Sequence, residues 1–223
     1  MNIICEYLET VKEPLNKETT TLKNTMTAVS YNRWVEAQNQ EFVEYTDHDI
    51  PRRRRGKGII FRYLGINFEE GWDNKTIVEV AAGSTPTLGF IEGNATKIAI
   101  EPLMARWDNH RASAEAQGIT IITDPYEHVD IKGTYGTVDE TWFFNCLQHV
   151  IDPKAQLEKA KATSKIIRVF EPLGGTVNLA HPHVISRNTF TEVLGDFGQI
   201  FKGGTEEGFH SFDCYYGTWR RED

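Results

Sequence analysis

The chain has 223 residues, of which 39% are hydrophobic and 25% are charged, and its formal net charge is −8. This length suffices to bury a sizeable core and fits one α/β domain with an appendage. The acidic balance disfavours a nucleic-acid partner, because basic side chains that contact phosphates supply most of the affinity for DNA and RNA.

Membrane insertion and a cysteine-based metal site are not indicated either. No apolar run approaches the ~20 residues of a membrane span. The three cysteines, Cys5, Cys146 and Cys214, form no CxxC pair, so reduced and buried thiols are the expected state. We therefore expect a protein of the cytoplasm with no membrane partner and no bound metal.

Residues 1–70 differ in pattern from the rest of the chain. A weak helical pattern covers residues 22–46, where one face at helical spacing is formed by Trp34, Gln38, Phe42 and Tyr45. Pro51 and the arginine run after it are expected to end this pattern, and a short apolar piece follows at 59–64. The chain is therefore divided into an N-terminal helical cap, residues 1–70, and a second domain, residues 71–223.

The run of four arginines at residues 52–55 has two interpretations. In the first it is a solvated loop that offsets nearby acids, which is the usual role of like-charge runs. In the second, Arg52 and Arg55 help to dock an anionic acceptor, because guanidinium groups bind phosphates through paired hydrogen bonds. The sequence leaves both open.

Strands and helices alternate from residue 76 onward. Runs rich in β-branched residues predict strands at 76–80, 97–100, 119–122, 138–144 and 166–170. Helices are expected between them, with first residues or caps at Pro86, Asp152 and Ser186. The helix after the second strand is expected to carry Leu103, Trp107 and Ala114 as its apolar stripe and to end at Gly118. The helix from Asp152 should end near Thr163, the last helix should end at Gly198, and two closing strands are expected at 199–202 and 210–220. This alternation predicts a mostly parallel sheet covered by helices on both faces.

A ligand of such a sheet binds beyond the carboxyl ends of the strands. The small-residue turn 81–85 follows the first predicted strand and lets backbone N–H groups approach a ligand closely. Glu101 directly follows the second strand, where a carboxylate can accept both hydroxyl protons of a ribose. The turn lacks the GxGxxG pattern, since its first position is Ala81, which disfavours a nicotinamide oxidoreductase.

Asp124, Tyr126 and Glu127 follow the third predicted strand. An acid beside an aromatic ring can accept the exocyclic amine of adenine and flank the ring. An ordinary Asp-Pro turn explains the same residues equally well.

An ordered set of segments resembles the small-molecule class I methyltransferases. The set comprises Glu79-x-Ala-x-Gly83, the segments 97–103 and 139–153, and His181-Pro182-His183 followed by 186–198. The resemblance covers residues 76–220. It implies a Rossmann-like, seven-stranded, mostly parallel sheet with an N-terminal helical cap, and S-adenosylmethionine as the cofactor with S-adenosylhomocysteine as the product.

The resemblance also implies a set of cofactor contacts. Glu79 would steady the turn, and Glu101, with Pro102 beside it, would hold the ribose. The methionine part would be lined by Ala81, Gly83 and Thr85, the adenine faced by Asp124, Tyr126 or Glu127, and the sulfonium approached by Asn145, Cys146 and Leu147. The family usually has glycine where this chain has Ala81 and Thr85, so a binding protein that has lost turnover is the alternative.

Methyl transfer to a hydroxyl acceptor needs a base with a near-neutral pKa, and the candidates are His149, His181 and His183. A structural role for each histidine is the alternative. The fourth strand ends in Phe143-Phe144-Asn145-Cys146 rather than in a Pro-Pro or Pro-Cys motif. This ending argues against methylation of nucleic-acid bases.

Trp34 to Phe42 loosely resembles the N-terminal helix of methyltransferases that act on sugars or surface glycans. By this resemblance the N-terminal segment would be a lid, and Tyr31, Trp34, Arg52 and Arg55 would face the acceptor. We therefore expect O- or N-methylation of a small polar or glycan-like acceptor. The oligomeric state is left open, a homodimer included.

Overall fold

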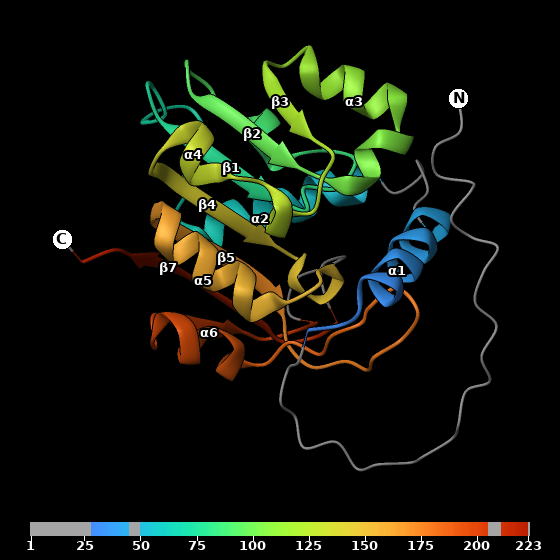
Figure 1. Cartoon of the computed structure of the whole chain (residues 1–223). Helices are drawn as coiled ribbons and strands as arrows, with labels where there is room; N and C mark the ends of the chain where they lie inside the picture. Colours follow the sequence, from blue (N-terminus) through green and yellow to red (C-terminus); the bar gives the residue numbers. More distant parts are fainter. Residues whose placement is uncertain (1–27, 45–49, 205–210, 223) are drawn as a thin grey trace, which may run out of the picture.

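A seven-stranded sheet with the strand order β3-β2-β1-β4-β5-β7-β6 forms the centre of the molecule (Figure 1). The computed structural model describes residues 28–44, 50–204 and 211–222, with the backbone alone for residues 44 and 50–54. The pairs among β1 to β5 are parallel, and β7 runs antiparallel to both of its neighbours. The strands are β1 Thr76–Val80, β2 Thr96–Ile100, β3 Ile119–Ile122, β4 Val138–Phe144, β5 Ser164–Pro172, β6 Gly198–Phe201 and β7 Cys214–Arg220.

The predicted strands are confirmed, because their β-branched and aromatic residues fill a sheet that is buried on both faces. Strand β5 is longer than predicted. It begins at Ser164 and reaches Pro172, since it pairs with β7 from Ile166 opposite Arg220 to Pro172 opposite Cys214. The expected seven-stranded, mostly parallel architecture with helices on both faces is therefore confirmed.

Helices α4 Ile131–Tyr135, α5 Pro153–Thr163 and α6 Arg187–Leu194 cover one face (Figure 1). The side chain of Asp152 accepts hydrogen bonds from two backbone N–H groups of the first turn of α5, as its sequence position predicts. The end predicted for α6 is wrong. The helix stops at Gly195, which has φ 77°, and Gly198 instead begins β6.

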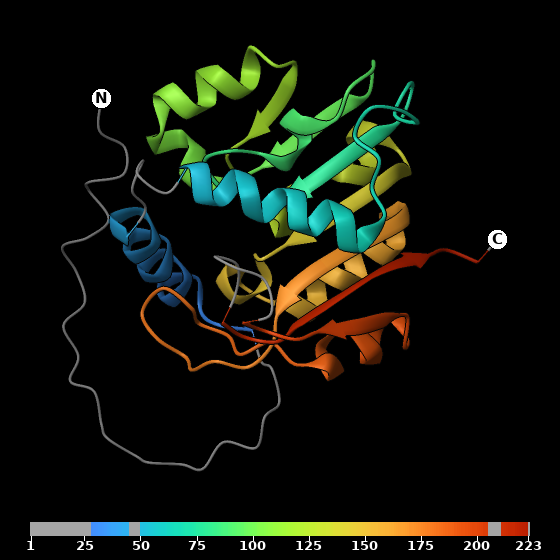
Figure 2. The same cartoon turned by 180° about the vertical axis from the view of Figure 1, so that it is seen from behind.

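Helix α2, Ile50–Leu64, covers the opposite face together with α3, Asp108–Glu115 (Figure 2). The expected break at Pro51 and the arginine run is wrong, because proline is tolerated in the first turn of a helix and arginine is a good helix former. The apolar end of α2 packs into the sheet core through Ile60, Phe61 and Leu64. Residue 70 stays a predicted boundary, but α2 packs with the sheet.

Two expected helices differ from the prediction. The helix expected at Pro86 is the turn η3, Thr87–Phe90, and Gly93 with φ 89° lies in the segment after it. The helix expected to carry Leu103 divides into η4, Pro102–Arg106, and α3. Two further turns, η5 Tyr126–His128 and η6 Leu147–His149, follow β3 and β4.

Helix α1, Tyr31–Glu44, lies across the carboxyl ends of the strands, outside the two helical layers (Figures 1 and 2). Near its start, the Arg33 guanidinium donates to the backbone carbonyls of Asn178 and Leu179. Near its end, the Phe42 ring stacks with Trp107 at 6.1 Å between ring centroids, and the Arg106 guanidinium lies 3.5 Å from the Phe42 ring centroid. Tyr45, predicted on the same face, lies outside the described residues.

Across residues 28–44, 50–204 and 211–222, no helix combines the length and the apolar character that crossing a bilayer demands.

A buried ion pair joins β4 to β5. Arg168 donates through Nε and Nη2 to the two carboxylate oxygens of Glu140, at 2.7 and 3.0 Å, and its Nη1 reaches the carbonyl of Leu64 on α2 at 3.2 Å. Glu140 is 1% exposed. The pair therefore connects the sheet to one of its helical layers.

Replacing Arg168 by Met should lower the free energy of unfolding by roughly 3–5 kcal/mol, because it leaves the buried Glu140 carboxylate without its ionic partner and, among the described residues, with only the Trp142 Nε1–H as a side-chain donor. Urea denaturation measures the loss. The matched control is Arg187→Met, which breaks an exposed pair with Asp196 and should have a much smaller effect. Equal losses in the two variants would contradict the assignment.

Candidate functional site

A cavity of about 570 Å³ lies at the carboxyl ends of the strands, beneath α1. Its walls come from α1, the middle of α2, the turns after β1, β2, β3 and β4, and the segment 172–185 after β5. This is the place where a parallel sheet of this order binds its ligands.

The turn after β1 is held by a buried carboxylate. Glu79 is 2% exposed and accepts hydrogen bonds from the backbone N–H groups of Thr87 at 2.9 Å and Leu88 at 3.0 Å. Ala81 has φ 47° and Gly83 has φ 67°. A left-handed alanine is strained by roughly 1–2 kcal/mol, which is a physical reason to find glycine at that position in similar proteins.

Glu101 connects the turn after β1 to the end of β2. Its Oε2 accepts a hydrogen bond from the Gly83 N–H at 2.7 Å, and its Oε1 accepts one from the Leu103 N–H at 2.9 Å. Burial raises the pKa of this carboxyl to about 7, and the negative charges of Glu41 and Glu79 act in the same direction. The site therefore holds an acid that a cationic or hydroxyl-bearing ligand can stabilise in its ionised form.

The turn after β4 is held in the same way by Glu171, which the sequence analysis missed. Glu171 is fully buried and accepts hydrogen bonds from the N–H groups of Cys146, at 2.9 Å, and Leu147, at 3.2 Å. Cys146 and Leu147 are themselves buried and do not line the cavity. Asn145 does line it, with φ 57°. Of the three residues predicted near the sulfonium, the cavity thus receives one.

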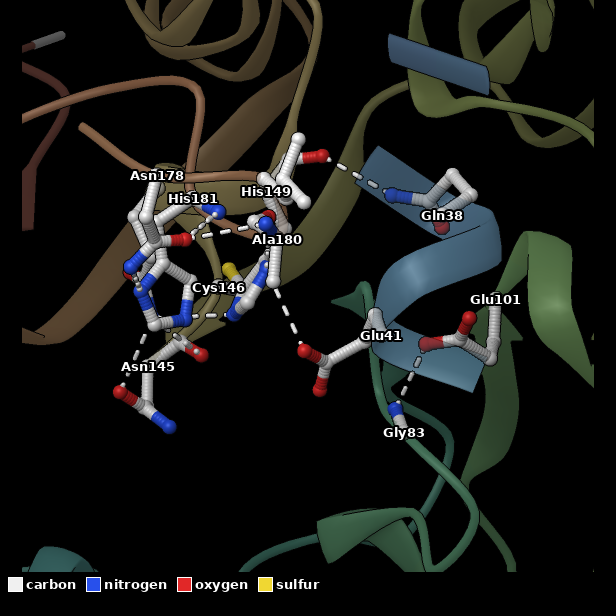
Figure 3. A network of polar contacts seen from close by, with 12 residues as sticks. Gln38, Glu41, Gly83, Glu101, Asn145, Cys146, His149, Asn178, Ala180 and His181 are labelled. Carbon is white, nitrogen blue, oxygen red and sulfur yellow. Dashed lines mark hydrogen bonds and ion pairs between the residues drawn. The ribbon is translucent and has the colours of Figure 1, made fainter. Parts of the chain in front are cut away.

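His149 and His181 pack edge-on against each other in the cavity wall, with 4.6 Å between their ring centroids. His149 Nδ1 lies 3.2 Å from the carbonyl oxygen of Ala180 and 3.8 Å from Oε2 of Glu41, as Figure 3 shows. A carbonyl oxygen only accepts, so Nδ1 carries the hydrogen and Nε2 keeps the lone pair. Gln148 Nε2 lies 3.2 Å from that Nε2.

His183 lines the same cavity but has a different environment. It is 6% exposed, and its Nε2 lies 2.8 Å from the carbonyl oxygen of Val150. Burial lowers the pKa of this imidazole, which favours its neutral form. The ring therefore connects the segment after β5 to the segment after β4.

Two of the three residues predicted after β3 line the cavity. Asp124 is exposed and does not line the cavity. Tyr126 lines the cavity, although its ring packs edge-on against Phe143 in the core. Glu127 also lines it, where Oε1 accepts from the N–H groups of Ile151 and Asp152 at 3.2 and 3.3 Å.

Of the predicted acceptor contacts whose side chains are described, only Trp34 lines the cavity. Trp34 is 6% exposed and lines the cavity. Tyr31 is 54% exposed and stacks on His128 outside the lining. Arg55 is exposed and does not line the cavity, and the side chain of Arg52 lies outside the described residues.

The last two predicted cofactor contacts, Thr85 and Pro102, both line the cavity. Sequence reasoning missed Lys57 of α2, which also lines the cavity. Its ammonium group donates a hydrogen bond to the Thr85 carbonyl. The same reasoning missed Glu41 of α1 too. Both missed residues come from the N-terminal 70, where no short motif marks them.

Glu101→Gln should change the pH dependence of stability. Because burial raises the pKa of folded Glu101 to about 7 from 4.5, the folded chain keeps a proton that the unfolded chain has lost. The free energy of unfolding of the native chain should therefore fall relative to the variant as the pH rises from about 4.5 to about 7, by roughly 3 kcal/mol. Above pH 7 the difference should stay constant.

Urea denaturation at a series of pH values measures this difference. Glu92→Gln, at an exposed position, is the control and should follow the native chain. If the difference in free energy of unfolding between the native chain and the Glu101→Gln variant does not vary with pH, Glu101 is not held in the environment described.

No protein-family profile matches the chain, and no curated protein matches it. Solved structures do. The chain is similar to the 1,6-didemethyltoxoflavin-N1-methyltransferase of Burkholderia thailandensis, which was solved with bound 1,6-didemethyltoxoflavin and S-adenosylhomocysteine. The two chains are 14% identical, the match covers 90% of this chain and 94% of that chain, and the TM-score is 0.59.

Two further solved structures have the same architecture. The N-methyltransferase NodS of Bradyrhizobium japonicum WM9 is 11% identical, with 78% of this chain and 99% of that chain covered and a TM-score of 0.56. The N-terminal domain of EvdMO1, solved in the presence of S-adenosylhomocysteine and D-fucose, is 14% identical, with 86% and 98% covered and a TM-score of 0.54. The chain therefore has the class I methyltransferase fold that its sequence predicts.

Proposed function

We propose that this protein is an S-adenosylmethionine-dependent methyltransferase that acts on a small polar acceptor. The observation that carries the proposal is the junction of Gly83 and Glu101 in the cavity. A buried carboxylate after β2 meets a small-residue turn after β1 at 2.7 Å, in a sheet of methyltransferase order. Similar structures solved with S-adenosylhomocysteine support the choice of cofactor.

The described residues fit this cofactor. S-adenosylmethionine carries a positive sulfonium and an ammonium group, and the cavity is lined by the acidic side chains of Glu41, Glu79 and Glu101. Glu127, also in the lining, has a buried Oε2 without a hydrogen-bond partner among the described residues. A donor such as the exocyclic amine of adenine would satisfy it, and Glu101 would accept the ribose hydroxyls.

When bound, S-adenosylmethionine supplies an electrophilic methyl group, and its sulfur leaves as the neutral thioether of S-adenosylhomocysteine. The protein's own task is to orient the acceptor and to take its proton. We assign the proton to His149 Nε2, which is the accepting nitrogen because Nδ1–H donates to the Ala180 carbonyl, and the acceptor would take the place of the Gln148 amide that lies 3.2 Å from it. This ring nitrogen would take the proton that the acceptor oxygen or nitrogen loses on methylation.

The other histidines have supporting roles in this proposal. His181 packs edge-on against His149 and helps to fix its ring. His183 holds the segment that carries His181, through its contact with the Val150 carbonyl.

A small polar acceptor suits the part of the cavity near α1. Trp34 supplies an apolar wall there, while Gln38 and Asn178 supply amides. Similar structures include an enzyme solved with 1,6-didemethyltoxoflavin and a domain solved in the presence of D-fucose, and both ligands are small and polar. We propose that α1 acts as a lid that excludes water from the acceptor.

The cofactor class is tested by ligand-dependent thermal unfolding of the full chain. S-adenosylhomocysteine should raise the melting temperature in a concentration-dependent way, because it binds the folded state alone. NAD and NADP should leave it unchanged. Stabilisation by a nicotinamide cofactor instead would overturn the proposal, and no stabilisation by S-adenosylhomocysteine would remove its main support.

Glu101→Ala tests the residue that carries the proposal. Removal of a charged hydrogen-bond partner should weaken S-adenosylhomocysteine binding by about 2–3 kcal/mol, or roughly 30- to 150-fold, as measured by titration calorimetry. Glu92→Ala, which removes an exposed acid, should bind as the native chain does. Unchanged affinity in a folded Glu101→Ala variant would refute the ribose contact.

A further inference from the structure

Three potential metal ligands meet in the cavity wall. Glu41, His149 and His181 each offer one ligand atom, and these atoms all lie within 4.8 Å of one another. The three residues come from α1, from η6 after β4 and from the segment after β5. In Figure 3 the Glu41 carboxylate reaches from α1 toward His149, with the Glu101–Gly83 contact on its other side. All three side chains are partly exposed to the cavity.

The backbone around these ligands is held in place before any ion binds. Asn178 Oδ1 accepts hydrogen bonds from the N–H groups of Ala180 and His181 at 2.9 and 2.8 Å. The Arg33 guanidinium of α1 binds the carbonyls of the same segment. Gln38 Nε2 of α1 donates to the His149 carbonyl at 3.1 Å. Helix α1 is thereby joined to both histidine-bearing segments.

The second coordination layer also has the usual partner of a histidine ligand. A ring nitrogen of a metal-bound histidine is commonly fixed by a hydrogen bond from the other ring N–H to a carbonyl or carboxylate. His149 Nδ1 lies 3.2 Å from the Ala180 carbonyl oxygen and 3.8 Å from Glu41 Oε2. Gln148 Nε2 lies 3.2 Å from His149 Nε2, so these contacts fix the ring before an ion binds. Gln148 has a buried Oε1 without a hydrogen-bond partner among the described residues, one position before His149.

We propose that Glu41, His149 and His181 bind a divalent first-row transition metal ion, such as Zn²⁺ or Fe²⁺, at the acceptor end of the cavity. Two imidazoles and one carboxylate are a donor set for such ions, whereas Mg²⁺ and Ca²⁺ prefer all-oxygen sites. Bonds of about 2.0–2.2 Å draw the ligand atoms closer together than 4.8 Å. Rotation of the partly exposed Glu41 side chain supplies that movement.

Three protein ligands leave coordination positions open toward the cavity, as in catalytic rather than structural metal sites. An acceptor oxygen or nitrogen would occupy one of them, and His149 would then act as a ligand. This use of the ion rests on the proposed function, but the binding of the ion does not. Because Glu41 lies on α1, the ion would also hold the lid closed over the cavity.

The test is a titration of the full chain, free of any histidine tag and stripped of metals, with Co²⁺ as a spectroscopic probe. We expect a saturable visible absorption band at one ion per chain, displaced by Zn²⁺ and unaffected by Mg²⁺. Glu41→Gln and His181→Ala should each weaken binding roughly 100-fold. His128→Ala, at an exposed histidine outside the cavity lining, should bind as the native chain does.

Thermal unfolding without metal shows whether each variant is folded, and added Zn²⁺ should raise the melting temperature of the native chain more than that of either ligand variant. A native chain without the band, or ligand variants that bind as tightly as the native chain, would overturn the proposal. S-adenosylhomocysteine binding by the same samples separates the two claims. Samples that bind S-adenosylhomocysteine but no metal would refute the metal site and leave the methyltransferase proposal intact. Samples that bind metal but no S-adenosylhomocysteine would do the reverse.

Discussion

Three buried glutamates at the carboxyl edge of the sheet determine the shape of the site. Glu79, Glu101 and Glu171 each accept hydrogen bonds from two backbone N–H groups of the turns that follow β1, β2 or β4. Turns at this edge leave N–H groups without secondary-structure partners, and a buried carboxylate satisfies two at once. The same arrangement concentrates acid in a poorly solvated place, and burial raises the pKa of both Glu101 and Glu171 to about 7.

Among the described residues, the cavity lining holds Glu41, Glu79, Glu101 and Glu127 against one lysine, Lys57. This excess of acid favours positively charged ligands, and it links the proposed cofactor to the proposed metal ion. Glu101 lies at the end where the cofactor would bind, and Glu41 at the end where the two histidines meet (Figure 3). Helix α1 closes the space between them, since Arg33 anchors its start and Phe42 anchors its end. Glu41, Glu101 and the two histidines are therefore brought into one cavity by a helix that is not part of either helical layer.

Local sequence patterns predicted the strands and singled out Gly83 and Glu101, which line the cavity, because β-branched runs and the positions of these two residues are properties of short segments. They failed where contacts distant in sequence decide the structure. Helix α2 was hidden by Pro51 and the arginines, although its apolar end packs on the sheet. Glu171 and Glu41 carry no motif, and their roles appear only once β5 and α1 are placed beside the turn after β4. Asp124 is exposed outside the cavity whereas Glu127 lines it, and the sequence alone could not distinguish the two acids.

The central claim is that one cavity binds the cofactor between the turn after β1 and Glu101 and presents its reactive end to His149. A crystal structure of the chain with S-adenosylhomocysteine tests this most directly. The claim predicts the ribose hydroxyls within hydrogen-bond distance of the Glu101 carboxylate, with the thioether sulfur directed toward the side of the cavity that carries His149 and His181. A ligand bound elsewhere, or one whose sulfur faces away from these histidines, would contradict it.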